Sequence, residues 1–594
     1  MAQGARLSPA GRAANLDRLA RETFDVVVVG GGVTGAGCAL DAATRGLTVA
    51  LVEQRDLGSG TSSRSSKLVH GGIRYLEQGN LGLVFEALQE RSLMLTTLAP
   101  HLVRPVSFLY PLTRRVWERA YVGAGIGLYD LFAGRPGLAG PVVRLAHRGG
   151  DRDRYRTMAE NPLPGHQHLS RRRALRLVPA LRADALVGAV RYWDAQVDDA
   201  RHTLTVARTA AGYGAVVASS LQVTDLLREG DRVVGVRARC VESSRLVDVR
   251  ARQVINATAT WTDQVQGLAG RGRIRVRASK GVHLVVPRDR IHADAGLLLR
   301  TPSSVLFVIP WGVHWIIGTT DTDWDLDLAH PAATRTDIDY LLGTVNTVLR
   351  APLTHHDIEG VYAGLRPLLE GESDATSELS RVHAVSQTVP GLVTVAGGKY
   401  TTYRVMAADA VDVAARNLSR RAPRSCTDRV PLWGAAGFVG LWHRRERLAD
   451  ESGLHVTRIE HLLRRYGSGI DELLDLVAER PELGRPLAGT GTYLGVEAAY
   501  AASHEAALHL DDVLTRRTRL SIETFHRGTD SADAAADLMG DELGWSEARR
   551  AEEVAAYGAR VAAERASQGA TDDRTADAVR LEGPDLRHLA PLAR

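Results

Sequence analysis

The sequence of 594 residues contains few cysteines, and the three present, Cys38, Cys240 and Cys426, lie far apart. An odd and sparse set excludes a disulfide framework, and the spacing matches no metal-ligand motif. The chain has no uninterrupted run of about 18 apolar residues, and its start lacks the apolar block of a signal peptide. We therefore expect a reduced, cytoplasmic protein that does not span a membrane.

Lysine is scarce, because only Lys67, Lys280 and Lys399 occur among the 74 lysines and arginines. Arginine serves wherever a surface cation suffices, so a remaining lysine is expected where a compact ammonium or a tunable pKa is needed. Chance survival in a sequence of biased base composition is the alternative explanation. The net charge of +5 is spread over a long chain and gives little reason to expect a nucleic-acid partner.

Hydrophobic residues make up 44% of the chain and charged residues 24%, a balance that excludes overall disorder, collagen and coiled coil. The length predicts two to four domains, each with its own core.

A dinucleotide-binding unit is predicted at residues 25–53. An apolar strand, 25–29, precedes the glycine-rich segment 30–35 and an alanine-rich helix over 36–45. In this context Gly30 permits a tight turn, Gly32 allows close approach of a pyrophosphate, and Gly35 lets the helix pack on the strand. The helix N-terminus attracts phosphate. A second strand, 47–52, ends at Glu53, which is positioned to bind ribose hydroxyls.

FAD is favoured over NAD by the spread of the strand ends that would line the cofactor. After the first unit, a strand at 252–255 runs into Ala257 and Thr258, and a Gly-Gly-Lys turn follows near residue 398. Strand ends dispersed over so much of the chain suit a long cofactor whose flavin lies far from its adenine.

The segment 61–77, Thr-Ser-Ser-Arg-Ser-Ser-Lys-Leu-Val-His-Gly-Gly-Ile-Arg-Tyr-Leu-Glu, is highly specific. It closely resembles the flavin-proximal segment of the FAD-dependent, respiratory glycerol-3-phosphate dehydrogenases. The resemblance extends in order over residues 24–410, through the segments 193–201, 279–283, 307–311, 317–321, 364–368 and 397–404, and is looser beyond residue 430. One departure is Ala259, which stands where the family usually has glycine; we expect it to add backbone strain or to crowd FAD.

This resemblance implies oxidation of sn-glycerol 3-phosphate to dihydroxyacetone phosphate by hydride transfer to flavin N5, with a membrane quinone as electron acceptor. The expected cofactor-binding residues are Gly30, Gly32, Val33, Thr34, Gly35, Glu53, Thr61, Ser62, Ser66, Lys67, Leu68, His70, Val223, Ala257, Thr258, Gly398, Lys399, Thr401 and Thr402.

The expected catalytic residues are His70, Arg74, Tyr75, His283, Arg366 and Lys399. Arginine meets phosphate as a bidentate fork, so Arg74 and Arg366 are candidate phosphate ligands. His70 and His283 are candidate bases, and the sequence does not decide between them. Lys399 and the helix starting near Tyr403 are positioned to stabilise negative charge on the reduced flavin.

The predicted fold class is α/β, with a Rossmann-type FAD-binding domain interleaved with an α+β substrate domain and followed by an all-α domain. The N-terminal extension is 1–22. FAD-binding segments are expected at about 23–105, 195–275 and 360–415, and substrate segments at about 106–194 and 276–359. The helical domain is expected at 425–594, with helices at 471–479 and 495–514 and a loosely ordered stretch from Ala566. The histidines at 166, 168, 355 and 356 have no third ligand nearby in sequence, so we expect no metal.

Arginines and aromatic residues flank a short apolar run in the segment 113–129, a mixture that suits a helix lying in the headgroup region of a membrane. Core packing of the same helix is the alternative. We expect peripheral association with the inner face of the plasma membrane, and the sequence leaves homo-oligomerisation open.

Two rival functions remain open. One is a soluble glycerol-3-phosphate oxidase that reduces O2; the other is a non-catalytic flavin- or RNA-binding module, for which the substrate-side motifs have no use.

Overall fold

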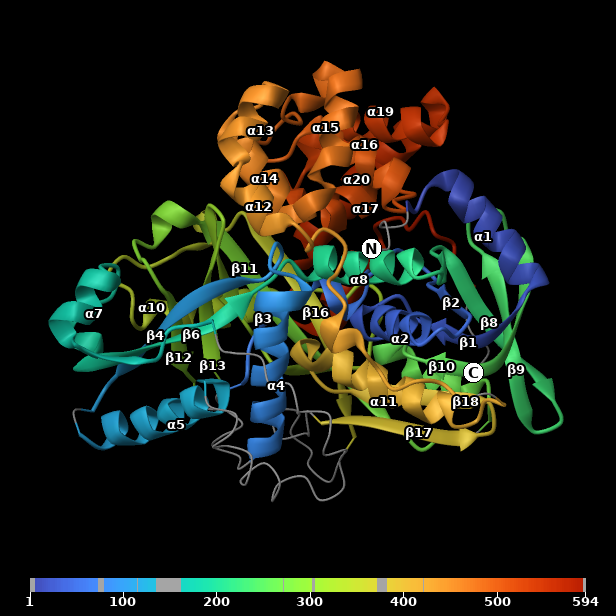
Figure 1. The fold of residues 1–594 in the computed structure, drawn as a ribbon. Helices are drawn as coiled ribbons and strands as arrows, with labels where there is room; N and C mark the ends of the chain where they lie inside the picture. The colour runs from blue at the N-terminus through green and yellow to red at the C-terminus, as the bar shows by residue number, and fades with distance from the viewer. Residues whose placement is uncertain are drawn as a thin grey trace.

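The computed structural model describes residues 6–72, 80–114, 116–134, 162–270, 272–301, 305–370, 382–419 and 421–590. Figure 1 shows two sheet-containing lobes side by side, with a helical domain in orange and red lying across the top of both. The predicted fold class is confirmed by this arrangement of an interleaved α/β part and an all-α C-terminal domain.

The first lobe is built on a sheet in the order β17-β18-β10-β1-β2-β7, extended by the β8–β9 hairpin. The four central pairings, from β18 to β7, are parallel. Its strands are β1 Thr23–Val29, β2 Val49–Val52, β7 Val216–Ala218, β8 Leu221–Glu229, β9 Arg232–Cys240, β10 Leu246–Asn256, β17 His383–Val389 and β18 Leu392–Gly397. Its helices are α1 Pro9–Arg21, α2 Val33–Thr44, α8 Asp199–Gly212, α9 Thr262–Gly267 and α11 Tyr403–Ala415.

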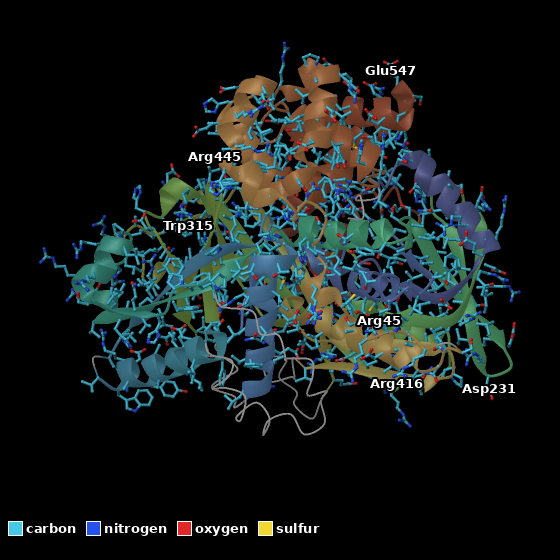
Figure 2. All side chains as sticks on the ribbon, viewed as in Figure 1. Arg45, Asp231, Trp315, Arg416, Arg445 and Glu547 are labelled. Atoms are coloured by element: carbon cyan, nitrogen blue, oxygen red, sulfur yellow. The ribbon has the colours of Figure 1, made fainter. Side chains whose placement is uncertain are left out.

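The second lobe contains a larger, mostly antiparallel sheet in the order β15-β11-β14-β13-β12-β4-β6-β3, with β16 paired to β11 and β5 to β6. Its strands are β3 Leu68–Val69, β4 Arg104–Leu112, β5 Gln167–Ser170, β6 Gly188–Gln196, β11 Val276–Pro287, β12 Gly296–Arg300, β13 Val305–Trp311, β14 His314–Gly318, β15 Thr322–Trp324 and β16 Gly360–Leu369. Its helices are α4 Leu81–Leu93, α5 Trp117–Gly134, α7 Arg171–Leu177 and α10 Arg335–Asn346. Trp315 is completely buried inside this lobe, whereas Asp231 and Arg416 lie at the outer edge of the molecule (Figure 2).

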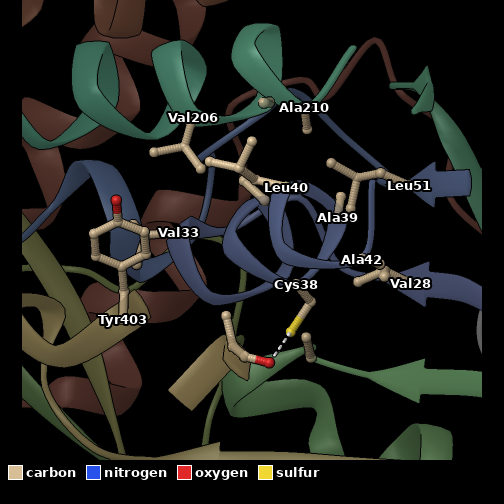
Figure 3. Packing of buried hydrophobic residues seen from close by; sticks show 14 of the residues in the cluster. Val28, Val33, Cys38, Ala39, Leu40, Ala42, Leu51, Val206, Ala210 and Tyr403 are labelled. Atoms are coloured by element: carbon tan, nitrogen blue, oxygen red, sulfur yellow. Dashed lines mark hydrogen bonds between the residues drawn. The ribbon is translucent and has the colours of Figure 1, made fainter. Parts of the chain in front are cut away.

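The strand β1 and the helix α2 form the centre of the first core. Side chains of α2 pack between the sheet and the helices α8 and α11 (Figure 3). Small residues make this close packing possible: a Cβ added at Gly37 would lie 3.0 Å from the ring of Tyr403. Cys38 is fully buried here, and burial raises the pKa of its thiol. This cysteine therefore serves packing.

The helical domain comprises α12 Phe438–His443, α13 Arg445–Ser452, α14 Val456–Tyr466, α15 Ile470–Glu479, α16 Gly495–His504, α17 Leu510–Asp512, α18 Leu520–Glu523, α19 Ala532–Leu543, α20 Glu547–Ser567 and α21 Asp573–Leu581. Buried ion pairs join it to the first lobe. Arg516 and Arg517 contact Asp56 at 2.5 and 2.7 Å, and Arg519 contacts Asp198 at 2.6 Å. Because breaking one partner of a buried pair leaves an uncompensated charge, these contacts fix the position of the domain.

Three expectations differ from the structure. The predicted helix over 495–514 ends at His504, because Ala506 adopts a φ of +59° and buried Glu505 turns toward Arg201. The stretch from Ala566 contains the ordered helix α21, whose Ala576 packs in an apolar cluster with Trp324. The strand β16, expected in the FAD-binding part, belongs to the second sheet, since it pairs with β11 along its whole length.

Candidate active site

Two adjoining clefts lie at the carboxyl ends of the central strands of the first sheet. The glycine cleft measures about 740 Å³, and the histidine cleft, between the two sheets, measures about 1740 Å³; both are partly open to solvent. Both clefts are lined by Thr61, Ser62 and Ala259, so they form one continuous site. Open parallel sheets bind ligands at this edge.

The turn between β1 and α2 has the geometry of a phosphate-binding loop. Gly30 has a φ of +110°, and a Cβ there would lie 2.6 Å from the carbonyl oxygen of Ala257. A Cβ at Gly35 would lie only 1.8 Å from the carbonyl oxygen of Gly30, so both positions require glycine. Gly32 is the N-cap of α2 and lines the cleft. The N-terminus of α2 therefore adjoins this cleft, with the backbone N–H of Val33 donating to the Ser62 hydroxyl at 2.9 Å.

Glu53 lies at the end of β2, beside the same turn. Its carboxylate accepts hydrogen bonds from the backbone N–H of Gly31 at 2.6 Å and of Arg55 at 2.8 Å. Burial raises the pKa of this carboxyl group, opposed by both hydrogen bonds. A carboxylate fixed at the end of the second strand is the group that binds ribose hydroxyls in such folds.

The glycine cleft therefore fits the adenosine diphosphate portion of FAD, and the histidine cleft has room for the flavin. Predicted cofactor residues that line the glycine cleft are Gly30, Gly32, Glu53, Thr61, Ser62, Val223, Ala257 and Thr258. Those that line the histidine cleft are Val33, Thr34, Thr61, Ser62, Ser66, Leu68, His70, Gly398, Lys399 and Thr401.

Arg366 projects from β16 into the histidine cleft, with its side chain 24% exposed. Its guanidinium donates to the Thr319 hydroxyl at 3.0 Å and to the Thr320 carbonyl at 3.1 Å, and it lies 3.4 Å from Asp321. Gly281 on the paired strand makes room for it, because a Cβ there would lie 2.5 Å from Arg366 Nη2. The guanidinium is therefore held in one orientation at the edge of the cleft.

His283 lies on β11 and stacks on the ring of Tyr362 at 4.7 Å between centroids. Its Nε2 is 2.8 Å from the hydroxyl of Ser66, which belongs to the flavin-proximal segment. Burial, with the nearby charges of Arg366 and Lys67, lowers the pKa of His283 well below its usual value. Burial and these two positive charges therefore favour the neutral form of the imidazole.

His70 and Lys399 come together across the cleft from two separate turns. Burial lowers the pKa of His70 to about 4, and the charge of Lys399 contributes to the shift. The backbone N–H of His70 donates to the Thr401 hydroxyl at 3.1 Å, which ties the two turns together. His70 is therefore also neutral at physiological pH, close to a cation that follows two glycines with φ of +76°.

Several predicted residues lie elsewhere. The Lys67 ammonium is fully buried and pairs with Asp199 at 2.9 Å, so it anchors the flavin-proximal segment to the protein core. Gly35 packs against the turn, and Thr402 is buried in the short helical turn Tyr400–Thr402. Lys67, Gly35 and Thr402 do not line either cleft. Arg74 and Tyr75 lie outside the described residues.

Some residues of the site were not singled out from the sequence. Asp194 lines the histidine cleft and is held by Arg91 at 2.7 Å and by the Tyr129 hydroxyl at 2.6 Å. Asp321 and Thr319 line the cleft beside Arg366. For Thr319 the available signal was Gly281, where an added Cβ would lie 2.6 Å from the Thr319 hydroxyl oxygen.

Ala259 has a φ of +53°, so alanine stands where the backbone favours glycine. The left-handed conformation costs an L-residue about 1–2 kcal/mol, whereas glycine loses about 0.5–1 kcal/mol of backbone entropy on folding. We expect Ala259→Gly to leave turnover intact and to tighten FAD binding, measured by titrating FAD into the apoprotein. Ser244→Gly is the matched control, because Ser244 has a φ of +58° in a loop outside both clefts. Weaker FAD binding in Ala259→Gly alone would show that the site is adapted to alanine.

Within the described residues, no group of three His, Cys, Asp or Glu side chains is arranged to hold a metal ion. No helix in the described part of the chain is long and apolar enough to cross a membrane.

Comparison with known proteins defines the class. Residues 25–404 match the family of FAD dependent oxidoreductases, and residues 425–550 match the C-terminal domain of alpha-glycerophosphate oxidase. The fold and the clefts described above are those of an FAD-dependent oxidoreductase.

More similar relatives define the family. The chain is 58% identical to glycerol-3-phosphate dehydrogenase 2 of Mycobacterium bovis, over 98% of this chain and 96% of that protein. It is 37% identical to the mitochondrial glycerol-3-phosphate dehydrogenase of Mus musculus, over 89% of this chain and 72% of that protein. The solved structure of the Bacillus halodurans glycerol-3-phosphate dehydrogenase complexed with FAD superposes with a TM-score of 0.73 at 27% identity, covering 94% of this chain and 98% of that one. The chain belongs to the FAD-dependent glycerol-3-phosphate dehydrogenases.

Proposed function

We propose that the histidine cleft binds glycerol 3-phosphate with its phosphate at Arg366. We also propose that the protein passes the electrons from this substrate to a membrane quinone. The observation that carries the first part is the guanidinium of Arg366, fixed by Thr319, Thr320 and Asp321 at the edge of a cleft that also contains two neutral histidines. FAD, when bound, accepts a hydride from the substrate carbon.

The protein supplies the remaining tasks. Oxidation of the alcohol releases the hydroxyl proton as the hydride leaves, and His70 or His283 is the proposed acceptor. The lowered pKa of each imidazole makes its protonation less favourable than that of a free histidine. Lys399 places a positive charge near His70, where it would stabilise the negative charge of a reduced flavin. Arg74 and Tyr75 remain predicted members of this site.

The helix α5 supports contact with a membrane surface. Its inner face packs in a cluster with α4 through Tyr129, Phe132 and Ala133. On its outer side Trp117 is 67% exposed and Tyr121 44% exposed, and their rings stack at 5.3 Å. Exposed aromatic residues on one helix face are typical of helices that lie in the headgroup region. We infer peripheral attachment to the cytoplasmic face of the plasma membrane, where a quinone is accessible.

Replacing Trp117 and Tyr121 together with serine is expected to weaken binding to phospholipid vesicles by about 10-fold or more, because two aromatic side chains lose their apolar contact. Vesicle sedimentation of the holoenzyme measures this binding. Phe525→Ser is the control, since Phe525 is 55% exposed but belongs to the helical domain. Equal vesicle binding by the double variant and the parent protein would exclude α5 as the attachment site.

A soluble oxidase that uses O2 is the second candidate, because the C-terminal match is to a domain of alpha-glycerophosphate oxidase. Peroxide yield separates the two acceptors. We expect the purified holoenzyme to reduce a soluble quinone rapidly and to form little hydrogen peroxide in air. One peroxide per substrate oxidised, with no acceleration by quinone, would establish the oxidase instead.

A further inference from the structure

A partly open cavity lies where the helical domain meets the flavin-proximal segment, and it adjoins the histidine cleft at Arg64. It measures about 780 Å³, including space open to solvent, and adjoins a second space of about 500 Å³. Arg64, His330, Arg560 and Arg580 line both spaces, which we call together the arginine cavity. These four residues come from the flavin-proximal segment, the loop before α10, α20 and α21.

Positive charge predominates on the walls. Six arginines and three carboxylates line the larger space, and four arginines and one carboxylate line the smaller one. Part of this excess is balanced by ion pairs, such as Arg55 with Asp585 at 2.6 Å and Arg587 with Asp512 at 2.7 Å. Arg560 also has acidic neighbours, in Asp511 and Glu564. Two arginines, Arg64 and Arg580, make no ion pair with the described residues and interact with Asp511 and Glu564 only at longer range.

Arg580 is 5% exposed, and its side chain makes no hydrogen bond or ion pair with the residues that the structure describes. Arg64 donates one hydrogen bond, to the carbonyl oxygen of Ala329 at 2.9 Å, and has no carboxylate partner among the described residues. Burial and the charges of Arg560, Arg516 and Arg580 lower the pKa of Arg64 to about 9. A buried cation without a partner at ion-pair distance is costly, so this arrangement favours a bound anion.

We propose that the arginine cavity binds a small soluble molecule carrying a phosphate group, held by Arg64, Arg560 and Arg580. Three guanidinium groups that converge from different elements match the several oxygens of a phosphate, each able to donate two hydrogen bonds. A space of about 780 Å³ between the domains suits a small molecule.

The arginine cavity adjoins the clefts described above, because Arg64 also lines the histidine cleft and Ser59 and Trp261 also line the glycine cleft. Arg64 directly precedes Ser65 and Ser66, and Ser66 binds His283. The backbone of Arg64 also packs on Gly364, where a Cβ would lie 2.5 Å from the Arg64 carbonyl oxygen. A phosphate bound to Arg64 therefore stabilises the loop that lines the histidine cleft.

Binding of inorganic pyrophosphate to the FAD-loaded protein tests the proposal by isothermal titration calorimetry. Arg366→Ala serves as the background, because it weakens anion binding in the histidine cleft. In that background we expect one pyrophosphate per chain. Adding Arg580→Gln should weaken its binding by at least about tenfold. Arg574→Gln is the matched control, an exposed arginine on the same helix α21, and should leave binding unchanged.

Thermal unfolding distinguishes a ligand site from a structural role. Without phosphate, Arg580→Gln should melt at the same temperature as the parent or higher, and pyrophosphate should raise the Tm of the parent but not of the variant. Absence of pyrophosphate binding in the Arg366→Ala background, or equal binding with and without Arg580→Gln, would overturn the proposal. If the glutamine variant does not fold, Arg580→Lys replaces it in the test. This variant keeps the charge and should bind pyrophosphate with intermediate affinity.

Discussion

Replacing Arg366 with alanine is expected to lower kcat/KM for glycerol 3-phosphate by about 10- to 150-fold, because a charge-assisted hydrogen bond contributes about 1.5–3 kcal/mol. Arg366→Lys keeps the charge but loses the planar two-point contact, so its loss should be smaller. Steady-state kinetics of the FAD-loaded variants with an artificial electron acceptor measure both effects.

Glycerol provides the internal control for this prediction, since it lacks the phosphate. Its low rate should change little in Arg366→Ala, whereas glycerol 3-phosphate should lose most of its advantage. Arg277→Ala is the matched variant, because Arg277 lies on the paired strand β11 and contacts Asp323 outside the cleft. An equal loss for both substrates at unchanged Tm would place Arg366 at the reacting carbon or the flavin. A collapse of the Tm would make its role structural.

Gly32→Val is expected to weaken FAD binding by about 5- to 150-fold, the equivalent of about 1–3 kcal/mol of overpacking. Gly32 has a φ of −73°, which any residue adopts, and the nearest atom to an added Cβ is the Ser62 oxygen at 3.2 Å. The chain should therefore fold, while the valine methyl groups occupy space in the glycine cleft. The ratio of flavin to protein after gel filtration, together with circular dichroism, measures the two properties separately.

Gly343→Val is the control for this substitution, because nothing lies within 4 Å of a Cβ at Gly343 in α10. It should retain a full complement of flavin. If Gly32→Val also retains one flavin per chain, the helix N-terminus of α2 does not contact the cofactor.

Local patterns predicted the first lobe well. The expected strand 25–29 is β1, Thr23–Val29, and the expected helix 36–45 overlaps α2, Val33–Thr44, because an apolar strand, a glycine turn and an alanine-rich helix all favour the same structure. Long-range contacts decided the elements that differ. Glu505 leaves the helical path to pair with Arg201 from the first lobe, and α21 is ordered by its contacts with residues far away in sequence.

The three lysines of the chain have two different roles. Lys67 pairs with Asp199, and Lys280 pairs with Asp337 at 2.7 Å, both as fully buried ammonium groups. Only Lys399 of the three lines the histidine cleft. The sequence identified all three as unusual, but it did not separate a buried ion pair from a site residue, because the acidic partners are distant in sequence.

The most direct test of the central claim is anaerobic titration of the FAD-loaded protein with glycerol 3-phosphate while the visible absorbance of oxidised flavin is recorded. We expect this band to bleach in proportion to the substrate added and dihydroxyacetone phosphate to form in equal amount, whereas glycerol at the same concentration leaves the band unchanged. A flavin that is fully bound, is reduced by dithionite, and yet is not bleached by glycerol 3-phosphate would contradict the account.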